Sequence, residues 1–444
     1  MNRLFIDNSI GELISRVEQG ELSVQEMVSA ALHNIREGEQ YGAFVVYAGD
    51  SLPKSFEGAA AKKGLLPYIP LGIKDIYNTT DFPTQMGSPL WKDFTPGNDA
   101  RAVYNLKRQG ALVVGKTVTA EFAVHELDKT LNPHDKTKTP GTSSSGSAVA
   151  VALGMVPAAT GTQTAGSIVR PASFCGVYAC KPSFGTIPRT GMLKTTDSLD
   201  SLGFFAVYAE DLRRMFNAMK VSGRNYPLSH AALSETARQQ KPASRPWKVA
   251  FVRTHTWGGV PQYAKDAMDA FAKKLSAEPG FEVEETEIPA SMSQTHETHA
   301  TIYNKSLSYY FQHEYTKAEQ ISPIMRQLIE QGKDIDRAAF AAALERQNKM
   351  IRDMDAFFAD YDAVICLSTS GEAPPRDVPE LPDPALMWTL THLPVISAPT
   401  FTSPAGLPFG LQLAARKYND YLLFQLLEEL QTRKLLPKQA SYVQ

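Results

Sequence analysis

Apolar residues recur along the chain at two different spacings, and each spacing predicts a different element. Between residues 9 and 35 they recur at helical spacing, which predicts amphipathic helices, and Ser23 is placed to cap the second of them. Between residues 42 and 77 the pattern changes to short apolar runs typical of buried strands, and the second run ends at Lys74. The chain therefore begins with packing helices and continues into a sheet.

Predicted helices and buried strands then alternate over most of the chain. We expect Asn98 and Asp99 to open a helix that runs to Gln109. The other predicted helices cover residues 148–153 and 211–219, and the other predicted strands cover 111–115, 156–160, 247–252, 363–367, 395–400 and 410–414. This alternation predicts an α/β fold in which a sheet is sandwiched between helices.

A change of composition in the second half of the chain bears on the number of domains. Residues 221–246 form a polar stretch that contains proline. The segment 261–359 after it is predicted to be mostly helical, with helices over 263–275, 294–315 and 324–358. The strands predicted beyond this segment resemble parts of the sheet predicted before it. We therefore expect one domain over residues 1–444, with 261–359 as an excursion from it.

Two clusters of hydroxyl-bearing residues lie within the small-residue stretch 139–182. The first is Ser143-Ser144-Ser145, and the second contains Ser167. Runs of glycine, serine and threonine are most often flexible linkers, but an apolar helix and strand separate these clusters. Because small residues let a backbone approach a ligand closely, we interpret the stretch as an ordered site with candidate nucleophiles.

Two known motifs do not fit this stretch. Residues 161–167 have the glycine spacing of a phosphate-binding P-loop, but Ser167 stands where that motif needs lysine. The nucleophile elbow of α/β-hydrolases needs glycine two positions after the serine, and Ser145 stands there after Ser143. The sequence therefore predicts neither a nucleotide site nor an α/β-hydrolase site here.

The stretch 139–182 does resemble the signature of the amidase signature family, together with an upstream lysine in the segment Leu71–Asp75. Shorter similarities lie at 115–122 and 406–413, whereas residues from about 220 to 360 show little. The signature core spans about residues 65–205. The resemblance implies a single large mixed β-sheet sandwiched between layers of helices, and it implies amide hydrolysis.

The family uses a Ser-cisSer-Lys triad, which the resemblance carries over by position. It implies that Ser167 is the nucleophile and that Lys74 is the base. It also implies that Ser143 follows a cis peptide bond and bridges Lys74 and Ser167. A serine hydroxyl needs a neighbour to take its proton, and a lysine held neutral can do so. An exposed lysine has a pKa of about 10.4, so Lys74 must be desolvated or placed near other donors to act at neutral pH. The structural alternative is an ion pair between Lys74 and Asp75.

The backbone around the proposed nucleophile is the candidate oxyanion hole. With Ser167 as nucleophile, the N–H groups of Thr164, Ala165, Gly166 and Ser167 would bind the substrate oxyanion. Consecutive small residues let such donors converge on one oxygen, and pre-positioned donors are usually the largest single catalytic contribution.

Three residues beside the triad depart from the commonest family pattern and are candidate substrate-binding residues. Thr142 replaces a glycine before Ser143, and Gln163 stands where aspartate is commonest. Arg170 is placed as in the branch that includes malonamidase, where the arginine binds the substrate carboxylate. Because a guanidinium can hold a carboxylate through two parallel hydrogen bonds, small carboxylate-bearing amides are a candidate substrate class. A structural ion pair of Arg170 is the alternative.

The helical excursion offers further candidates. Its aromatic residues could line an acyl pocket, with ordinary helix packing as the alternative: Tyr303, Tyr309, Tyr310 and Phe311. The run His296–His299 does not have the H-E-x-x-H spacing of a zinc site, and no third ligand is evident. We therefore expect no metal site and no cofactor.

The amino-acid composition limits the classes of binding partner and the cellular compartment that we expect. Lysine plus arginine, 45, nearly balances aspartate plus glutamate, 47, which argues against nucleic acid or an anionic membrane as partner. Three cysteines are too few for a disulfide framework, and residues 1–10 lack an apolar core of signal length, so we expect a cytoplasmic protein. We expect a small-molecule amide as partner and leave a homodimer open.

The predicted function is that of an amidase, which releases an acid and ammonia or an amine from a linear amide through a seryl acyl-enzyme. Two alternatives stay within the family: an acyl-transferring, amide-forming enzyme, and the glutaminase subunit of a tRNA-dependent amidotransferase. Gln163 and Arg170 count against the second. A non-catalytic binding protein is the alternative from another class, and the presence of all three triad positions argues against it.

Overall fold

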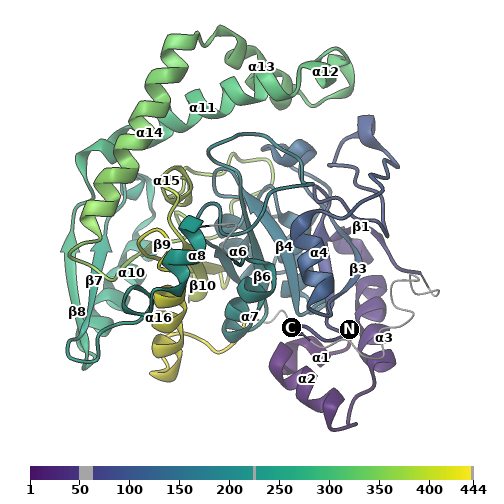
Figure 1. Ribbon diagram of the computed structural model, residues 1–444, viewed down its shortest axis with the longest axis horizontal. Coiled ribbons are helices and arrows are strands. Elements are labelled where there is room, and N and C mark those ends of the chain that lie inside the picture. The colour runs from purple at the N-terminus through teal and green to yellow at the C-terminus, as the bar shows by residue number, and fades with distance from the viewer. Residues whose placement is uncertain (50–63, 224–226, 442–444) are drawn as a thin grey trace.

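The computed structural model describes residues 1–49, 64–223 and 227–441, and a single mixed sheet of 11 strands runs through them (Figure 1). The strand order is β1-β3-β2-β4-β6-β5-β10-β11-β9-β7-β8. The strands are β1 (Phe44–Tyr47), β2 (Pro70–Lys74), β3 (Leu112–Thr117), β4 (Ala158–Gln163), β5 (Tyr178–Lys181), β6 (Ser201–Ala206), β7 (Trp247–Val252), β8 (Phe281–Thr286), β9 (Ala363–Leu367), β10 (Val395–Thr402) and β11 (Pro408–Ala414). The predicted α/β class is confirmed.

Helices surround this sheet. They are α1 (Leu4–Asp7), α2 (Ile10–Glu18), α3 (Val24–Glu37), α4 (Arg101–Arg108), α5 (Ser145–Ala152), α6 (Val169–Cys175), α7 (Ala209–Met219), α8 (Pro227–Ser234), α9 (Thr236–Gln239), α10 (Gln262–Ser276), α11 (Thr295–Tyr310), α12 (Gln312–Tyr315), α13 (Pro323–Asp334), α14 (Arg337–Phe357), α15 (Ala385–Leu390) and α16 (Asp420–Thr432). Within the described ranges, none of the helices combines the length and the apolar character that crossing a membrane requires.

The first two amphipathic helices form where the sequence predicts them. Ser9 and Ser23 cap α2 and α3, and each takes part in a complete capping box with the glutamate three residues later. The apolar stripe of each helix is buried, for example at Leu13 and Met27. The capping serines thus fix where both helices begin, and their apolar faces fix how they pack.

Helix α5 starts in the first serine cluster and is the most deeply buried helix of the signature stretch. All eight of its residues are buried, and it packs against β4, β2 and α6. A Cβ at Gly146 would lie 2.4 Å from the Ala43 carbonyl oxygen and from the Val118 nitrogen. Small residues are therefore required here because the helix lies directly on neighbouring backbone.

Three expectations about local structure need correction. Helix α4 begins at Arg101 without a side-chain cap, because its N-cap residue is Ala100, and Asp99 accepts hydrogen bonds from Thr80 and Lys107. The polar stretch 221–246 contains two short helices, α8 and α9. The predicted helix over 324–358 is two helices, α13 and α14, because Asp336 caps a new one.

The segment 261–359 is also less purely helical than expected. Its first part, α10 and β8, returns to the sheet, where β8 pairs in parallel with β7 as the edge strand. The part that leaves the sheet begins after β8 and carries α11, α13 and α14. Helices α13 and α14 each pack on α11, and the three form an arm along one end of the molecule (Figure 1). Strands on both sides of this segment belong to the same sheet, which is the arrangement that the one-domain prediction requires.

Candidate active site

Lys74 is the last residue of β2, and its side chain is fully buried among hydroxyl groups. Its Nζ lies 2.9 Å from Ser143 Oγ, 2.9 Å from Ser144 Oγ and 2.9 Å from Thr162 Oγ1. Burial lowers the pKa of Lys74 to about 7, against the raising effect of Asp128 and Asp200. A substantial fraction of this amine is therefore neutral at neutral pH.

The alternative ion pair between Lys74 and Asp75 does not form. The Asp75 carboxylate instead lies 2.9 Å from Nζ of Lys116, which also donates to Thr84 Oγ1 at 2.8 Å. Side chains on successive residues of a strand point to opposite faces of a sheet, so Lys74 and Asp75 point apart. The carboxylate next to Lys74 in sequence thus has another cation as its partner.

The first serine cluster surrounds Lys74 and continues to a buried carboxylate. The Thr142–Ser143 peptide bond is cis, as the family resemblance implies. Ser144 Oγ donates to the Thr162 carbonyl oxygen at 3.2 Å, which connects the cluster to β4. Ser145 Oγ donates to Asp128 Oδ2 at 2.5 Å, so the Asp128 carboxyl group contacts the residue next to Ser144, whose hydroxyl contacts Lys74.

The second cluster follows β4 directly. Ser167 is 5% exposed, and within the described residues its hydroxyl has no hydrogen-bond partner. The structure thus joins Lys74 to Ser143 by a hydrogen bond but does not join Ser143 to Ser167 in this way. Catalytic hydrogen bonds are often long or unformed before substrate binds, so this geometry is compatible with a serine awaiting substrate.

In the turn 164–167, side chains donate hydrogen bonds to two backbone carbonyl oxygens, whereas three backbone N–H groups have no acceptor among the described residues. His299 Nε2 donates to the Thr164 oxygen at 2.8 Å, and Thr389 Oγ1 donates to the Ala165 oxygen at 2.8 Å. In the part of the chain that the structure describes, no acceptor binds the backbone N–H of Ala165, Gly166 or Ser167. Donors with no partner beside a serine are what an oxyanion hole needs.

Gln163, one of the three substrate-binding candidates, is fully buried beneath this turn. Its Oε1 accepts from the backbone N–H groups of Ile168 and Val169 at 2.9 and 3.0 Å, and its Nε2 donates to Thr389 Oγ1 at 2.9 Å. The amide thereby holds the start of α6 against α15. The contacts of Gln163 are those of a side chain that supports the loop, and contact with substrate stays a prediction.

Arg170 has two carboxylate partners. Its Nε donates to Asp383 Oδ2 at 2.7 Å, and its Nη1 donates to Glu380 Oε2 at 2.6 Å. Nη1 also lies 3.3 Å from Thr142 Oγ1. The structural ion pair that we considered for this residue is therefore present, and its role as a carboxylate clamp stays a prediction.

Glu380 joins the two serine-bearing segments. Besides Arg170, its carboxylate accepts from Thr139 Oγ1 at 3.1 Å, from the Thr142 N–H at 3.3 Å and from Thr142 Oγ1 at 3.4 Å. The backbone just before Ser143 is thus tied to the helix that follows Ser167. Glu380 and Asp383 both bind Arg170 beside the serines, and no motif in the sequence predicts either residue.

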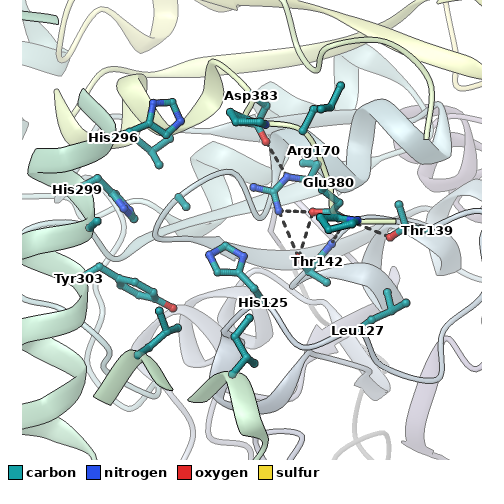
Figure 2. Close-up of a pocket in the computed structure, with 18 of the residues that line it drawn as sticks. His125, Leu127, Thr139, Thr142, Arg170, His296, His299, Tyr303, Glu380 and Asp383 are labelled. Atoms are coloured by element: carbon teal, nitrogen blue, oxygen red, sulfur yellow. Dashed lines mark hydrogen bonds and ion pairs between the residues drawn. The ribbon is translucent and has the colours of Figure 1, made fainter. Parts of the chain in front are cut away.

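A pocket of about 610 Å³ opens beside these residues (Figure 2). Its inner wall includes Thr142, which precedes Ser143, and Ala165, which lies two residues before Ser167. Another part of this wall consists of Arg170, Glu380 and Asp383. The arm supplies the opposite wall through α11 and α13, including His296, His299, Tyr303, Ile324 and Leu328. Tyr303 is the one of the four predicted aromatic residues that lines this pocket.

Three histidines are a second feature of the pocket. The sequence pattern drew attention to His296 and His299 only as a metal site that we rejected, and it did not point to His125. His125, His296 and His299 all line the pocket. His296 Nδ1 lies 2.9 Å from His255 Nε2, and His299 contacts the Thr164 oxygen. His125 comes three residues after segment 115–122, which resembles the family sequence. This closeness in sequence was the one indication that His125 lies near the site. Among the described residues no group of three or more potential ligands that could hold a metal is found.

Comparison with known proteins gives a match over most of the chain. The profile of the Amidase family matches residues 26–424. The A subunit of glutamyl-tRNA(Gln) amidotransferase from Streptococcus pyogenes is 29% identical over an alignment of 467 residues, which covers 95% of each chain.

Two solved structures agree with the fold. A 6-aminohexanoate cyclic dimer hydrolase complexed with substrate superposes with a TM-score of 0.86 at 18% identity and covers 99% of each chain. The A subunit of glutamyl-tRNA(Gln) amidotransferase from Thermotoga maritima gives a TM-score of 0.83 at 23% identity and covers 100% of this chain and 99% of its own. At these identities the likeness concerns the fold, a large mixed sheet with surrounding helices.

Proposed function

Since the chain belongs to the amidase signature family, we propose that it hydrolyses a carboxylic amide through an acyl-enzyme formed on Ser167. The observation that carries this proposal is the environment of Lys74. A buried amine with a pKa of about 7 that contacts Ser143 is suited to accept a proton from a serine hydroxyl.

The proposed reaction passes protons along the two serines. Neutral Lys74 takes the proton of Ser143 Oγ, which takes the proton of Ser167 Oγ as this oxygen attacks the amide carbonyl carbon. The proton then returns along the same path to the leaving nitrogen, the C–N bond breaks, and ammonia or an amine departs. Water attacks the resulting ester by the same proton route and releases the acid, which regenerates Ser167.

The backbone of residues 164–167 would stabilise the tetrahedral intermediate. The N–H groups of Ala165, Gly166 and Ser167 have no other acceptor among the described residues and are thus available to the oxyanion. Gln163 and Thr389 hold the turn from behind, so these donors need little rearrangement when charge develops on the oxygen. Gln163 and Thr389 are positioning residues in this mechanism.

A second candidate function rests on the relative from Streptococcus pyogenes. Its name is that of one component of an amidotransferase, and the match covers 95% of both chains. As such a component, this chain would form the acyl-enzyme from glutamine, release ammonia, and work in a complex with other subunits. Hydrolysis of amides by the isolated chain favours the first candidate, whereas glutaminase activity that requires copurified partner proteins favours the second.

The test compares wild type with Ser167→Ala, Ser143→Ala and Lys74→Ala on a panel of primary amides. Wild-type protein should release ammonia and should be labelled at Ser167 by a fluorophosphonate. Each variant should lose at least about 10²-fold in kcat/KM, because each removes one part of the proton path. Ser29→Ala is a matched control, since Ser29 is exposed on α3.

Retention of full amide hydrolysis by pure Ser167→Ala protein would contradict the proposed mechanism. Product analysis with an added amine separates hydrolysis from acyl transfer, because an acyl-transferring enzyme forms the new amide in preference to the acid. Thermal unfolding of each variant, unchanged within a few degrees, shows that lost activity does not reflect lost folding.

A further inference from the structure

The pocket contains an arginine beside the nucleophile, but its carboxylate-binding edges are already engaged. A guanidinium holds a carboxylate through two neighbouring nitrogens, either Nη1 with Nη2 or Nε with Nη2. In Arg170, Nη1 lies 2.6 Å from Glu380 and Nε lies 2.7 Å from Asp383. Each edge therefore has one nitrogen occupied, so a substrate carboxylate cannot form the paired contact without displacing one of these acids.

The surrounding charges also disfavour an anion. Of the residues that line the pocket, Arg170 and Arg376 are cationic, and Asp377, Glu380 and Asp383 are acidic, so two positive charges stand against three negative ones. Burial lowers the pKa of His125 and of His299 to about 4, and it lowers that of His296. The imidazoles are therefore neutral at neutral pH and add no positive charge.

His125 is a pocket residue with unused hydrogen-bonding capacity. Its ring packs edge-on to Tyr303, with centroids 6.3 Å apart, and in Figure 2 it projects between Tyr303 and Arg170. Among the described residues, neither ring nitrogen has a hydrogen-bond partner. This contrasts with His299, which donates to the Thr164 oxygen, and with His296, which pairs with His255.

A neutral imidazole offers one donor and one acceptor, which suits an uncharged group of the same kind. We propose that the pocket binds amides that carry a second, uncharged hydrogen-bonding group, that His125 recognises this group, and that a carboxylate in its place is disfavoured. This inference rests on the proposed function, because it assigns the substrate class to the same site. His125 is a specificity-determining residue in this proposal, while bond cleavage stays with Ser167.

The experiment measures ligand binding without turnover. Ser167→Ala protein is titrated by NMR with glutaramide, which has a neutral second amide, with glutaramate, which has a carboxylate, and with hexanamide, which has neither. Each titration is repeated with His125→Phe, which keeps a ring but removes both polar nitrogens, and with His125→Asn, which keeps one donor and one acceptor. His33→Phe is the control, because His33 is exposed on α3.

We expect glutaramide to bind at least threefold more tightly than glutaramate. His125→Phe should weaken glutaramide binding by about 3- to 10-fold, the range of one hydrogen bond, and leave hexanamide unchanged. His125→Asn should restore most of the loss, and His33→Phe should change nothing. A merely structural role of His125 would weaken all three ligands alike.

Two results would overturn the inference: tighter binding of glutaramate than of glutaramide, or the same affinity for glutaramide in His125→Phe protein. Fluorophosphonate labelling of the wild type is measured separately. Absence of labelling with intact binding of glutaramide would contradict the proposed function, whereas labelling without the binding differences would contradict this inference alone.

Discussion

Lys116 Nζ lies 2.9 Å from the carboxylate of Asp75, and neither side chain is exposed. Lys116 reaches this carboxylate from β3, the strand that pairs in parallel with the strand of Lys74. Because Lys116 neutralises Asp75, the carboxylate nearest to Lys74 in sequence contributes little field that would keep Lys74 protonated. The two lysines on these adjacent strands thus have different partners: Lys116 binds the Asp75 carboxylate, and Lys74 binds hydroxyl groups.

Removal of either partner of this pair should destabilise the protein strongly. Lys116→Met leaves the Asp75 charge buried without a counter-charge, and we expect the free energy of unfolding to fall by about 3–5 kcal/mol. The midpoint of chemical denaturation measures the change. The double variant Asp75→Asn/Lys116→Met should be less destabilised than the sum of the two single variants, since it buries no unpaired charge. Additive losses would show that the two side chains do not interact.

The activity of the enzyme should rise with pH through about 7. The pKa of Lys74 is lowered to about 7 by burial, and its neutral form, present above that pH, is the proposed base. The profile of kcat/KM against pH should therefore have an acid limb near 7. Lys74→Arg, which stays protonated at every accessible pH, should lose about 10²- to 10⁴-fold in kcat/KM. Lys92→Arg, at an exposed position, is the control.

Asp128 should determine where that acid limb lies. Its carboxylate accepts from Ser145 and from the Thr130 N–H, Arg376 faces it, and its charge raises the pKa of Lys74. Asp128→Asn removes the charge but keeps the size of the side chain, so the pKa of Lys74 should fall and the limb should move to lower pH. Rates measured at pH 5.5 to 8 detect the shift.

The exposed Asp266→Asn should leave the pH profile unchanged. Burial raises the pKa of Asp128 itself, so its charge is the assumption under test. An acid limb that stays in place in Asp128→Asn protein would mean that this carboxyl group is uncharged in the working pH range.

Gly166 should tolerate no side chain. A Cβ at this position would lie 2.8 Å from Arg170 Nη2 and 2.9 Å from both Asp383 carboxylate oxygens. Gly166→Ala must therefore shift the turn or break the Arg170–Asp383 pair, and misplacing one oxyanion donor costs about 10²- to 10³-fold in kcat. Steady-state kinetics measure the loss. Gly258→Ala, where a Cβ meets nothing within 4 Å, is the matched control and should keep full activity.

Local sequence patterns predicted most of the strands but not the central strands β5 and β6, and the family resemblance implied the contact between Lys74 and Ser143. They did not reveal β8, although Phe281 and Val283 alternate with glutamates in the way typical of a half-buried strand. Helices on both sides of this short run dominated the pattern. An edge strand buries one face only, so its apolar signal is half that of the central strands.

The acids and histidines of the pocket were missed for a different reason. Glu380 and Asp383 meet Arg170 from more than 200 residues away. No periodicity in the sequence connects such positions, because the contact arises only when the segment between β9 and α15 folds against α6. Thr162 and Ser144 are intermediate cases: they lie inside the signature stretch, but only the geometry shows that both contact Lys74.

The insertion of the arm between β8 and β9 has a consequence for engineering. The part of the gene that encodes α11 to α14 supplies one wall of the pocket, while Lys74 and both serine clusters are encoded well upstream. Chimeras that exchange residues 290–357 with those of a relative would replace that wall and leave the reaction centre in place. The graft has to retain His299, because its Nε2–H binds the Thr164 oxygen and is a direct contact between the exchanged helices and the catalytic turn.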